Sequence, residues 1–324
     1  MGEFDLIARY FTRPVRRNAL GVGDDCALLA PAPGMQLAVS SDMLVEGRHF
    51  FADVYPAHLG HKALAVNLSD LAACGARPLA FTLALSLPRV DEAWLKGFSE
   101  GLLALADAHE CELVGGDTTQ GPLNICVTVF GEVQAGQALL RSGARTGDDI
   151  WVSGTLGDAR LALDALRGQV QLPPEVLAPA RARLERPTPR VALGQALRGV
   201  ARSAIDLSDG LLGDVGHILA ASCVGARIDT ALATGLIAAC AADAGAAARL
   251  DPDVLLQCVL AGGDDYELAF TAAPDRRADV AAAALRADTP VTRIGTIEAT
   301  PGLRLVDAQG HPLNARYASF DHFA

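Results

Sequence analysis

A run of nine residues, Leu79–Leu87 (LAFTLALSL), is nearly all apolar, a pattern typical of a strand buried on both faces. Residues 58–74 before it and 91–109 after it carry apolar residues at helical spacing, and Gly75 is a suitable C-cap for the first of these helices. A short helix is expected over 4–11, stopped near Pro14. Two further strands are expected at 39–44 and 123–133. Strands and helices in alternation predict a mixed α/β layered fold.

The length of 324 residues predicts two domains, at roughly 100–200 residues per domain. Residues 138–148 are turn-rich and polar, so we expect an N-terminal domain over 1–138 and a C-terminal domain over 139–324. The second half is expected to contain strands at 150–153 and 267–271, helices at 238–250 and 255–260, and a proline-rich loop stretch over 173–189.

The charge and cysteine content exclude several classes of protein. A net charge of −11 opposes binding to nucleic acid or to an anionic membrane surface. No apolar stretch reaches the roughly 18 residues of a membrane span, and the first residues lack the layout of a secretion signal. Seven scattered cysteines, never spaced C-x-x-C, indicate reduced thiols rather than disulfides or zinc ligands. We therefore expect a soluble, cytoplasmic protein.

Lysine occurs only at positions 62 and 96, and arginine supplies the rest of the 27 basic residues. If the protein handles phosphates, the neutralising charge must come from arginine or from metal ions.

Seven short segments place aspartate beside glycine or serine at the edge of an apolar run, and those outside the strand expected at 39–44 and the helix expected at 58–74 are expected to form turns. They are 21–25 (GVGDD), 40–42 (SSD), 67–70 (NLSD), 115–119 (GGDTT), 157–158 (GD), 206–210 (DLSDG) and 262–265 (GGDD). A single Gly-Asp pair is common turn chemistry. Seven acidic segments together point to a cation, because gathered carboxylates repel one another without one.

The donor types indicate which cation. Oxygen ligands select hard cations, and no His/Cys cluster supports zinc. The DLSDG segment lacks the spacing of a calcium-binding EF-hand loop. Magnesium uses one or two carboxylates per ion together with substrate phosphates, so the sequence predicts several Mg²⁺ ions on a polyphosphate.

Other nucleotide-binding motifs are missing from the sequence. There is no G-x-x-x-x-G-K-[ST], no protein-kinase signature and no G-x-G-x-x-G opening a helix. The Gly21-x-Gly23 pair runs directly into two aspartates, which would repel a bare pyrophosphate.

These motifs, in this order, resemble the thiamine-monophosphate kinases, in the superfamily of aminoimidazole ribonucleotide synthetase and selenophosphate synthetase. The resemblance spans nearly the whole chain, and its more specific parts are Gly47-x-His49-Phe50 and the ending Phe320-Asp321-His322-Phe323. It implies a two-domain aminoimidazole-ribonucleotide-synthetase-like architecture and a homodimer paired through N-terminal sheets. It also implies Mg²⁺-dependent, direct in-line transfer from ATP to thiamine monophosphate, giving thiamine diphosphate and ADP without a phosphoenzyme, the last step of thiamine diphosphate biosynthesis.

The resemblance also assigns roles to individual residues. Implied magnesium ligands are Asp25, Ser40, Ser41, Asp42, Asp70, Asp117, Asp206 and Asp209, the serines through side-chain or main-chain oxygen. Implied ATP contacts are Gly116, Asp117, Arg141 and Ser208, with Arg141 assisting transfer. Implied thiamine-phosphate contacts are His49, Asp264 and Phe320.

Two of these positions depart from the family pattern, and several have a plain structural alternative. Asp264 stands where relatives often have Glu, and Phe320 where they often have Tyr or Trp. The alternatives are a surface arginine at 141, a loop-supporting histidine at 49, a core phenylalanine at 320 and a turn-orienting role for Asp206. Asp24, Asp158 and Asp265 are interpreted as structural residues or as residues that support the ligands without touching the metal or substrate.

Three rival functions remain at this point. Selenophosphate synthetase would need a reactive Cys or selenocysteine in a glycine-rich N-terminal segment, which is absent here. Aminoimidazole ribonucleotide synthetase shares the fold, and fold alone does not decide the substrate. A non-catalytic Mg-ATP sensor would bind ATP without consuming it.

Overall fold

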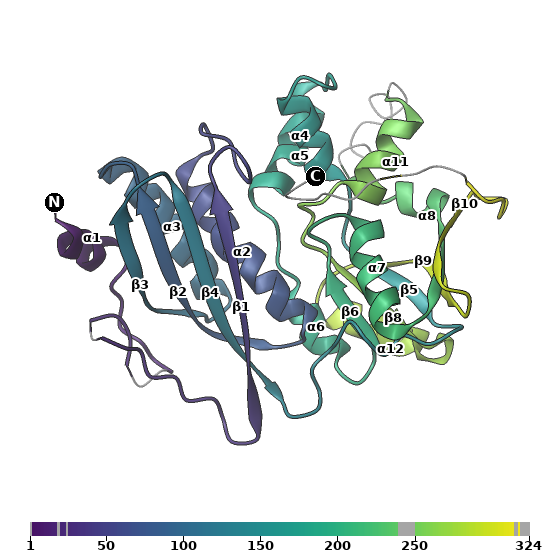
Figure 1. Cartoon of the computed structure of the whole chain (residues 1–324), viewed down its shortest axis with the longest axis horizontal. Coiled ribbons are helices and arrows are strands. Elements are labelled where there is room, and N and C mark those ends of the chain that lie inside the picture. Colours follow the sequence, from purple (N-terminus) through teal and green to yellow (C-terminus); the bar gives the residue numbers. More distant parts are fainter. Residues whose placement is uncertain (1, 18–19, 24, 239–249, 314–316, 318–324) are drawn as a thin grey trace. The chain divides into compact units, whose positions relative to one another are not determined.

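The chain forms two compact units, each a β-sheet with packed helices (Figure 1). The computed structural model describes residues 2–17, 20–23, 25–238, 250–313 and 317. Unit 1 comprises residues 1–71 and 76–138, and unit 2 comprises residues 72–75 and 139–324. Across the described ranges, no helix is both long and apolar enough to cross a membrane.

Unit 1 contains a four-stranded sheet in the order β1-β4-β2-β3, as Figure 1 shows. Its elements are α1 (Glu3–Tyr10), β1 (Met35–Val45), α2 (Pro56–Ala73), β2 (Arg77–Leu87), α3 (Glu92–Ala108), β3 (Glu112–Gln120) and β4 (Asn124–Gln134). Strand β4 pairs antiparallel with β1 and β2, whereas β2 and β3 are parallel. Strands β1 and β3 therefore lie at opposite edges of the sheet.

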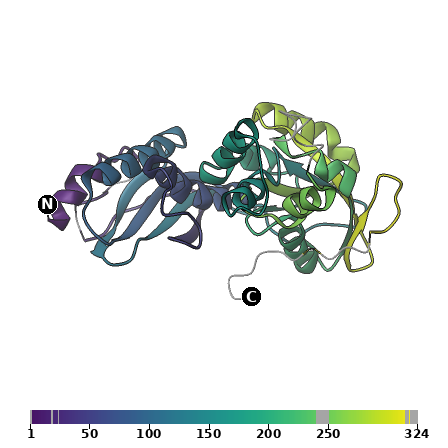
Figure 2. The same ribbon diagram turned by 90° about the horizontal axis from the view of Figure 1, so that it is seen from above.

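Helices cover one face of this sheet, as the purple and blue ribbons in Figure 2 show. Helix α3 begins at its N-cap Asp91, whose side chain accepts hydrogen bonds from the amides of Ala93 and Trp94, and it buries Leu95, Phe98 and Leu102 along one side. On the other face of the sheet, β1 leaves a row of apolar side chains exposed: Leu37 (43%), Val39 (56%) and Met43 (53%).

Unit 2 contains a six-stranded sheet in the order β10-β7-β9-β5-β8-β6. Its strands are β5 (Asp149–Ser153), β6 (Ser203–Asp206), β7 (Gly225–Asp229), β8 (Leu268–Ala272), β9 (Val291–Glu298) and β10 (Gly302–Val306). Its helices are α4 (Asp158–Leu166), α5 (Pro174–Glu185), α6 (Val191–Leu197), α7 (Leu211–Ser222), α8 (Thr230–Thr234), α11 (Pro252–Ala261) and α12 (Arg277–Arg286), with the 3₁₀ turn η1 (Pro274–Arg276).

Buried ion pairs accompany the apolar core of unit 2. Asp149 at the start of β5 is buried and bonds Arg277 and Arg293. The Arg277 hydrogen bond, against the opposing effect of burial, holds the pKa of the Asp149 carboxyl below its usual value, with Arg293 adding to the effect.

The mixed α/β fold expected from the alternation of patterns is confirmed, and the apolar run is β2. Of the seven acidic segments, 40–42 lies in β1 and 67–70 in α2, in agreement with the strand expected at 39–44 and the helix expected at 58–74. The segment 115–119 lies in β3, so the expectation of a turn there was wrong. The expectation of a loop over 173–189 was also wrong. Residues 174–185 form α5, because Pro174 begins the helix and Pro179 is accommodated within it. Most of the helix expected at 238–250 lies outside the described residues.

Candidate active site

The first group of predicted ligands lies where β1 meets α2. The Ser40 hydroxyl donates a hydrogen bond to Asp70 Oδ2, and the Asp42 amide donates to Asn67 Oδ1 at 3.0 Å. Ser40 and Asp42 are two residues apart on a strand, so their side chains share a face. Three oxygen-bearing side chains, those of Ser40, Asp42 and Asp70, are thereby gathered at one place in unit 1.

Ser41 presents its side chain to the opposite face of the same strand. Its hydroxyl contacts Thr128 Oγ1 at 2.9 Å and donates to the Val127 carbonyl at 3.2 Å. The structure therefore does not bring the Ser41 hydroxyl to the side occupied by Ser40 and Asp42.

Gly116 and Asp117 lie on β3, directly after an irregularity in its pairing with β2. Leu113 pairs with Phe81 and Gly115 with Thr82, so Val114 is an extra residue on β3. Position 116 requires glycine, because its φ is +149° and a Cβ there would lie 1.8 Å from the Leu83 carbonyl oxygen.

A cavity of about 700 Å³ opens beside this part of β3. Its walls include Phe4 and Ile7 from α1, Phe11 directly after that helix, residues 115–118 of β3, and Asp25. Asp25, Gly116 and Asp117 therefore share one cavity whose lining includes both carboxylates and apolar side chains.

The sheet register separates Asp42 from Asp117. Strand pairing aligns Asp117 with Ala84, Ala84 with Cys126, and Cys126 with Met43, the neighbour of Asp42. The two aspartates are thus nearly level along the strands but three strand spacings apart, roughly 14 Å at about 4.8 Å per spacing. Aligned residues share a face, so Asp117 lies on the face of exposed Met43 and Asp42 on the other face.

His49 lies in a turn after β1 and is fixed in one tautomer. The Val45 amide donates to His49 Nδ1 at 3.0 Å, so the neutral ring carries its proton on Nε2. Lys62 of α2 is 3% exposed and donates to the His49 carbonyl at 3.4 Å. In the neutral ring, Nε2–H is therefore the donor.

In unit 2, Asp206 ends β6, and Ser208 and Asp209 follow in the turn before α7. The Asp214 carboxylate accepts hydrogen bonds from the amides of Ser208 and Asp209 at 3.0 and 3.1 Å and so holds this turn. Burial raises the pKa of the Asp214 carboxyl to about 7, although these amide bonds act in the opposite direction.

Asp264 lies directly beside that turn. Its amide donates to the Ser208 carbonyl at 2.9 Å, and the Tyr266 amide donates to the Leu207 carbonyl at 2.8 Å. The structure therefore brings Asp206, Ser208, Asp209 and Asp264 together in unit 2.

Arg141 and Phe320 complete the predicted set. The Arg141 side chain is exposed, and its guanidinium forms no ion pair among the described residues. Phe320 lies outside the described residues.

The donor chemistry fits magnesium. Within the described part of the chain, no three His, Cys, Asp or Glu side chains converge to hold a metal ion. What the units offer instead are small groups of carboxylate and hydroxyl oxygens, as at Ser40, Asp42 and Asp70. Magnesium binds through one or two carboxylates and takes its remaining ligands from water and substrate phosphates.

Sequence reasoning missed the residues that hold these groups in place. Asn67 is buried within α2, where asparagine is unfavourable without a specific partner, and Asp214 lies in the first turn of α7, where a carboxylate can accept free amides. Those positional signals could have identified both residues. Lys62, which holds the His49 carbonyl, carried no comparable signal.

Comparisons with known proteins agree with the resemblance in the sequence. Residues 23–133 match the family model described as AIR synthase related protein, N-terminal domain. The thiamine-monophosphate kinase of Salmonella typhimurium is 46% identical over 329 residues, covering 100% of this chain and 98% of that protein.

Solved structures agree as well. Thiamine-monophosphate kinase from Stenotrophomonas maltophilia K279a has a TM-score of 0.83 and 46% identity, covering 96% of both chains. The structure described as AaThiL complexed with AMPPCP and TMP has a TM-score of 0.75 and 28% identity, covering 91% of this chain and 89% of that one. The similarity covers the whole of this chain, and the chain belongs to the thiamine-monophosphate kinase family.

Proposed function

We propose that this protein transfers the γ-phosphoryl group of ATP to thiamine monophosphate, giving thiamine diphosphate and ADP, the last step of thiamine diphosphate biosynthesis. The observation that carries the proposal is 46% identity to a thiamine-monophosphate kinase over the full chain. A relative solved with AMPPCP and TMP supports the same pair of substrates. The described cysteines form no disulfides, which supports a reducing compartment, the cytoplasm.

The chemistry needs positioning more than a strong base. A phosphate oxygen of thiamine monophosphate attacks the γ-phosphorus of ATP in line, and the bond to the β,γ-bridging oxygen breaks as ADP leaves. This nucleophile is already anionic near neutral pH, so no proton has to be removed and no phosphoenzyme is required. The protein's task is to hold two anions in reacting geometry.

Several Mg²⁺ ions, when bound, would neutralise the phosphates and stabilise the departing charge. The residues that would hold them are Asp25, Ser40, Ser41, Asp42, Asp70, Asp117, Asp206 and Asp209. The hydrogen bond from Ser40 to Asp70 supports this assignment, because it orders two oxygen donors before any ion arrives. For Ser41, the engaged hydroxyl leaves the main-chain oxygen as the donor.

We place ATP against Gly116 and Asp117, with Ser208 and Arg141 as its further contacts. The apolar wall from Phe4 and Phe11 suits the planar base, and the glycine allows the phosphates to approach the backbone. The Arg141 guanidinium can donate two parallel hydrogen bonds to a phosphoryl group during transfer, which lysine cannot.

Thiamine monophosphate is assigned to His49, Asp264 and Phe320. The Nε2–H of His49 would donate to the phosphate of the substrate, as its fixed tautomer supports. Asp264 would accept from the aminopyrimidine, and Phe320 would stack on a ring of the substrate.

The sheet supports a homodimer in which the reaction site draws on both copies. Asp42 and Asp117 lie on opposite edges and opposite faces of one sheet, so one copy does not bring them to the same ion. The exposed row Leu37, Val39 and Met43 supplies an apolar face for a second copy to cover.

Phosphorus NMR of the purified protein with Mg-ATP tests the reaction, comparing thiamine monophosphate, free thiamine and no acceptor. Thiamine diphosphate with matching ADP, formed only from the monophosphate, is expected. ATP that binds without acceptor-dependent transfer would refute the kinase assignment. Asp42→Asn and Asp209→Asn should each largely abolish turnover in a folded protein, and near-normal turnover at saturating magnesium would refute the metal assignment.

Mixing inactive variants tests the shared site. We expect co-expressed Asp42→Asn and Asp117→Asn chains to regain part of the activity, because a mixed dimer would contain one site with both aspartates intact. A monomer in sedimentation equilibrium, or no recovery from demonstrated mixed dimers, would contradict this arrangement.

A further inference from the structure

The turn that carries Asp264 is strained. Asp264 and Tyr266 have φ values of +61° and +51°, in the left-handed region that non-glycine residues rarely adopt. Such conformations persist only where the surrounding structure holds them, and they often occur at functional sites. The contacts of the segment 263–267 should therefore include the groups that hold Asp264 in place.

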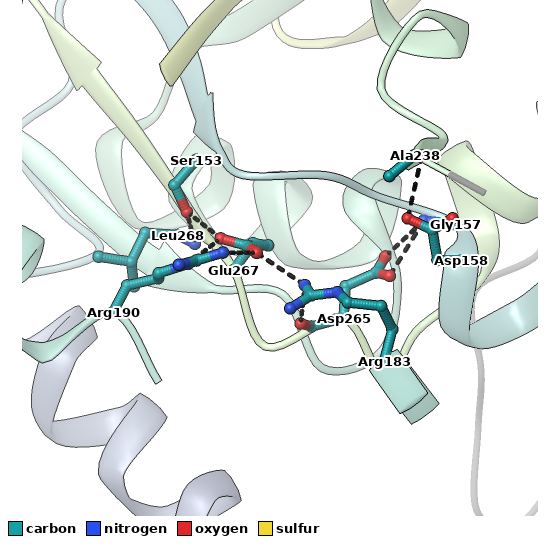
Figure 3. Close-up of polar contacts among 9 residues, drawn as sticks. All are labelled: Ser153, Gly157, Asp158, Arg183, Arg190, Ala238, Asp265, Glu267 and Leu268. Atoms are coloured by element: carbon teal, nitrogen blue, oxygen red, sulfur yellow. Dashed lines mark hydrogen bonds and ion pairs between the residues drawn. The ribbon is translucent and has the colours of Figure 1, made fainter. Parts of the chain in front are cut away.

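Glu267, at the end of this segment, is its buried anchor. Its side chain has 0% exposure and receives four hydrogen bonds (Figure 3): one from Ser153 Oγ at 2.5 Å, one from Arg183 at 2.7 Å, and two from Arg190 at 2.6 and 2.5 Å. Gly154 packs directly against it, since a Cβ at 154, where φ is +56°, would lie 2.2 Å from Glu267 Oε1. Glu267 is thereby confined to one position.

Arg183 differs from Arg190 in what it holds. Both guanidinium groups bond the Glu267 carboxylate, but Arg183 Nη2 also donates to the main-chain carbonyl of Asp265 at 3.3 Å. Figure 3 shows Arg183 between Asp265 and Glu267. That carbonyl belongs to the peptide that joins Asp265 to Tyr266, within the strained turn.

The Asp265 side chain holds the turn through a second contact, with the residue that precedes α4. Its two carboxylate oxygens accept from the Gly157 amide at 3.0 and 3.1 Å. The turn is thus held between the start of α4, through Gly157, and α5, through Arg183. Asp264 itself is held by the hydrogen bond from its amide to the Ser208 carbonyl.

We propose that Arg183 is a positioning residue for the thiamine-monophosphate site, holding the turn 263–267 so that Asp264 faces the substrate. The proposal rests on the proposed function, specifically on the assignment of Asp264 to thiamine monophosphate. Arg183 acts through the backbone of the turn and does not itself touch the substrate. Lysine should replace it only in part, because its flexible ammonium lacks the fixed planar geometry with which the guanidinium reaches the carboxylate and the carbonyl together.

The test is steady-state kinetics of full-length Arg183→Met and Arg183→Lys, with thiamine monophosphate and ATP varied separately. Arg183→Met is expected to raise the KM for thiamine monophosphate roughly tenfold, the scale of coupling within one hydrogen-bonded network, while the KM for ATP changes less than about twofold. Arg183→Lys is expected to fall between Arg183→Met and the wild type.

Arg181→Met is the matched control. Arg181 lies on the same helix and forms its own pair with Glu185 at 2.6 Å, away from the turn. It should leave the KM for thiamine monophosphate unchanged. A similar rise in this control would overturn the proposal, because it would assign the effect to α5 in general.

A double-mutant cycle with Asp264→Asn gives a readout that a purely structural role would not produce. If Arg183 acts through Asp264, Arg183→Met should change kcat/KM for thiamine monophosphate much less in the Asp264→Asn background than in the wild type. Additive effects, or a wild-type KM in the folded fraction of Arg183→Met, would overturn the proposal. Failure of the wild type to phosphorylate thiamine monophosphate would instead refute the proposed function, so the two failures are distinguishable.

Discussion

Replacing Glu267 by glutamine should destabilise unit 2 strongly. The change keeps the size of the side chain but removes a fully buried charge, leaves two arginines without their shared carboxylate, and turns an N–H group towards a guanidinium. Breaking a buried ion pair by changing one partner costs about 3–5 kcal/mol of unfolding free energy. For a unit of this size that corresponds to a fall in Tm of roughly 6–20 °C.

The positions of the two tryptophans allow the unfolding free energy of unit 2 to be measured separately from that of unit 1. Trp151 lies on β5 and stacks on Phe270, whereas Trp94 lies on α3 of unit 1. In a Trp94→Phe background, urea unfolding followed by fluorescence reports on the surroundings of Trp151. The same substitution at Glu298, which pairs with Arg227 at 3.6 Å and with Arg304 at 3.2 Å in partly exposed positions, should cost less than about 1 kcal/mol.

If Glu267→Gln lowers the unfolding free energy of unit 2 by less than about 1 kcal/mol, the reasoning is refuted. The buried ion pairs of Glu267 would then contribute no more than a surface ion pair does. An equal decrease in unfolding free energy in Glu267→Gln and Glu298→Gln would lead to the same conclusion.

Three further predictions concern other parts of the chain. Gly116→Ala should force β3 away from the Leu83 carbonyl and cost unit 1 about 3 kcal/mol or more, measured by Trp94 fluorescence in a Trp151→Phe background; an unchanged urea midpoint would contradict it. The depressed pKa of Asp149 means that its ionised form stabilises the fold above the unfolded pKa of about 3.9, and that this stability is lost as the pH falls through the lower folded value. In Asp149→Asn, the unfolding free energy of unit 2 should therefore fall less steeply as the pH drops below about 4. The same pH dependence in the variant and the wild type would exclude this role. Lys62→Met should release the His49 carbonyl and raise the KM for thiamine monophosphate more than that for ATP, with exposed Lys96→Met as the control; equal changes in both constants would indicate a packing role.

Strong periodic patterns predicted the regular elements well. The apolar run 79–87 is most of β2, and the helical spacing over 91–109 matches α3 within one residue at each end. Strand β3 was missed at residues 115–119 because two glycines, an aspartate and two threonines have the composition of a turn. Pairing with β2 determines their conformation, and the composition of one segment does not reveal its partner strand.

The candidate site shows the same limit. The acidic residues could be named from their local motifs, but their grouping depends on contacts between distant segments. Asp42 meets Asn67 because α2 packs on β1, and Asp117 is separated from Asp42 by two strands that come from other parts of the chain. Spacing along the sequence contains neither fact.

The packing of Gly154 against Glu267 also restricts how this family can diverge. No side chain fits at 154 while a full-length glutamate occupies its present place, since even a Cβ would overlap the carboxylate. An aspartate at 267 would withdraw the carboxylate by one methylene and open that space. A side chain at 154 should therefore occur only in lineages that have also changed 267, and the substitution at 267 has to come first.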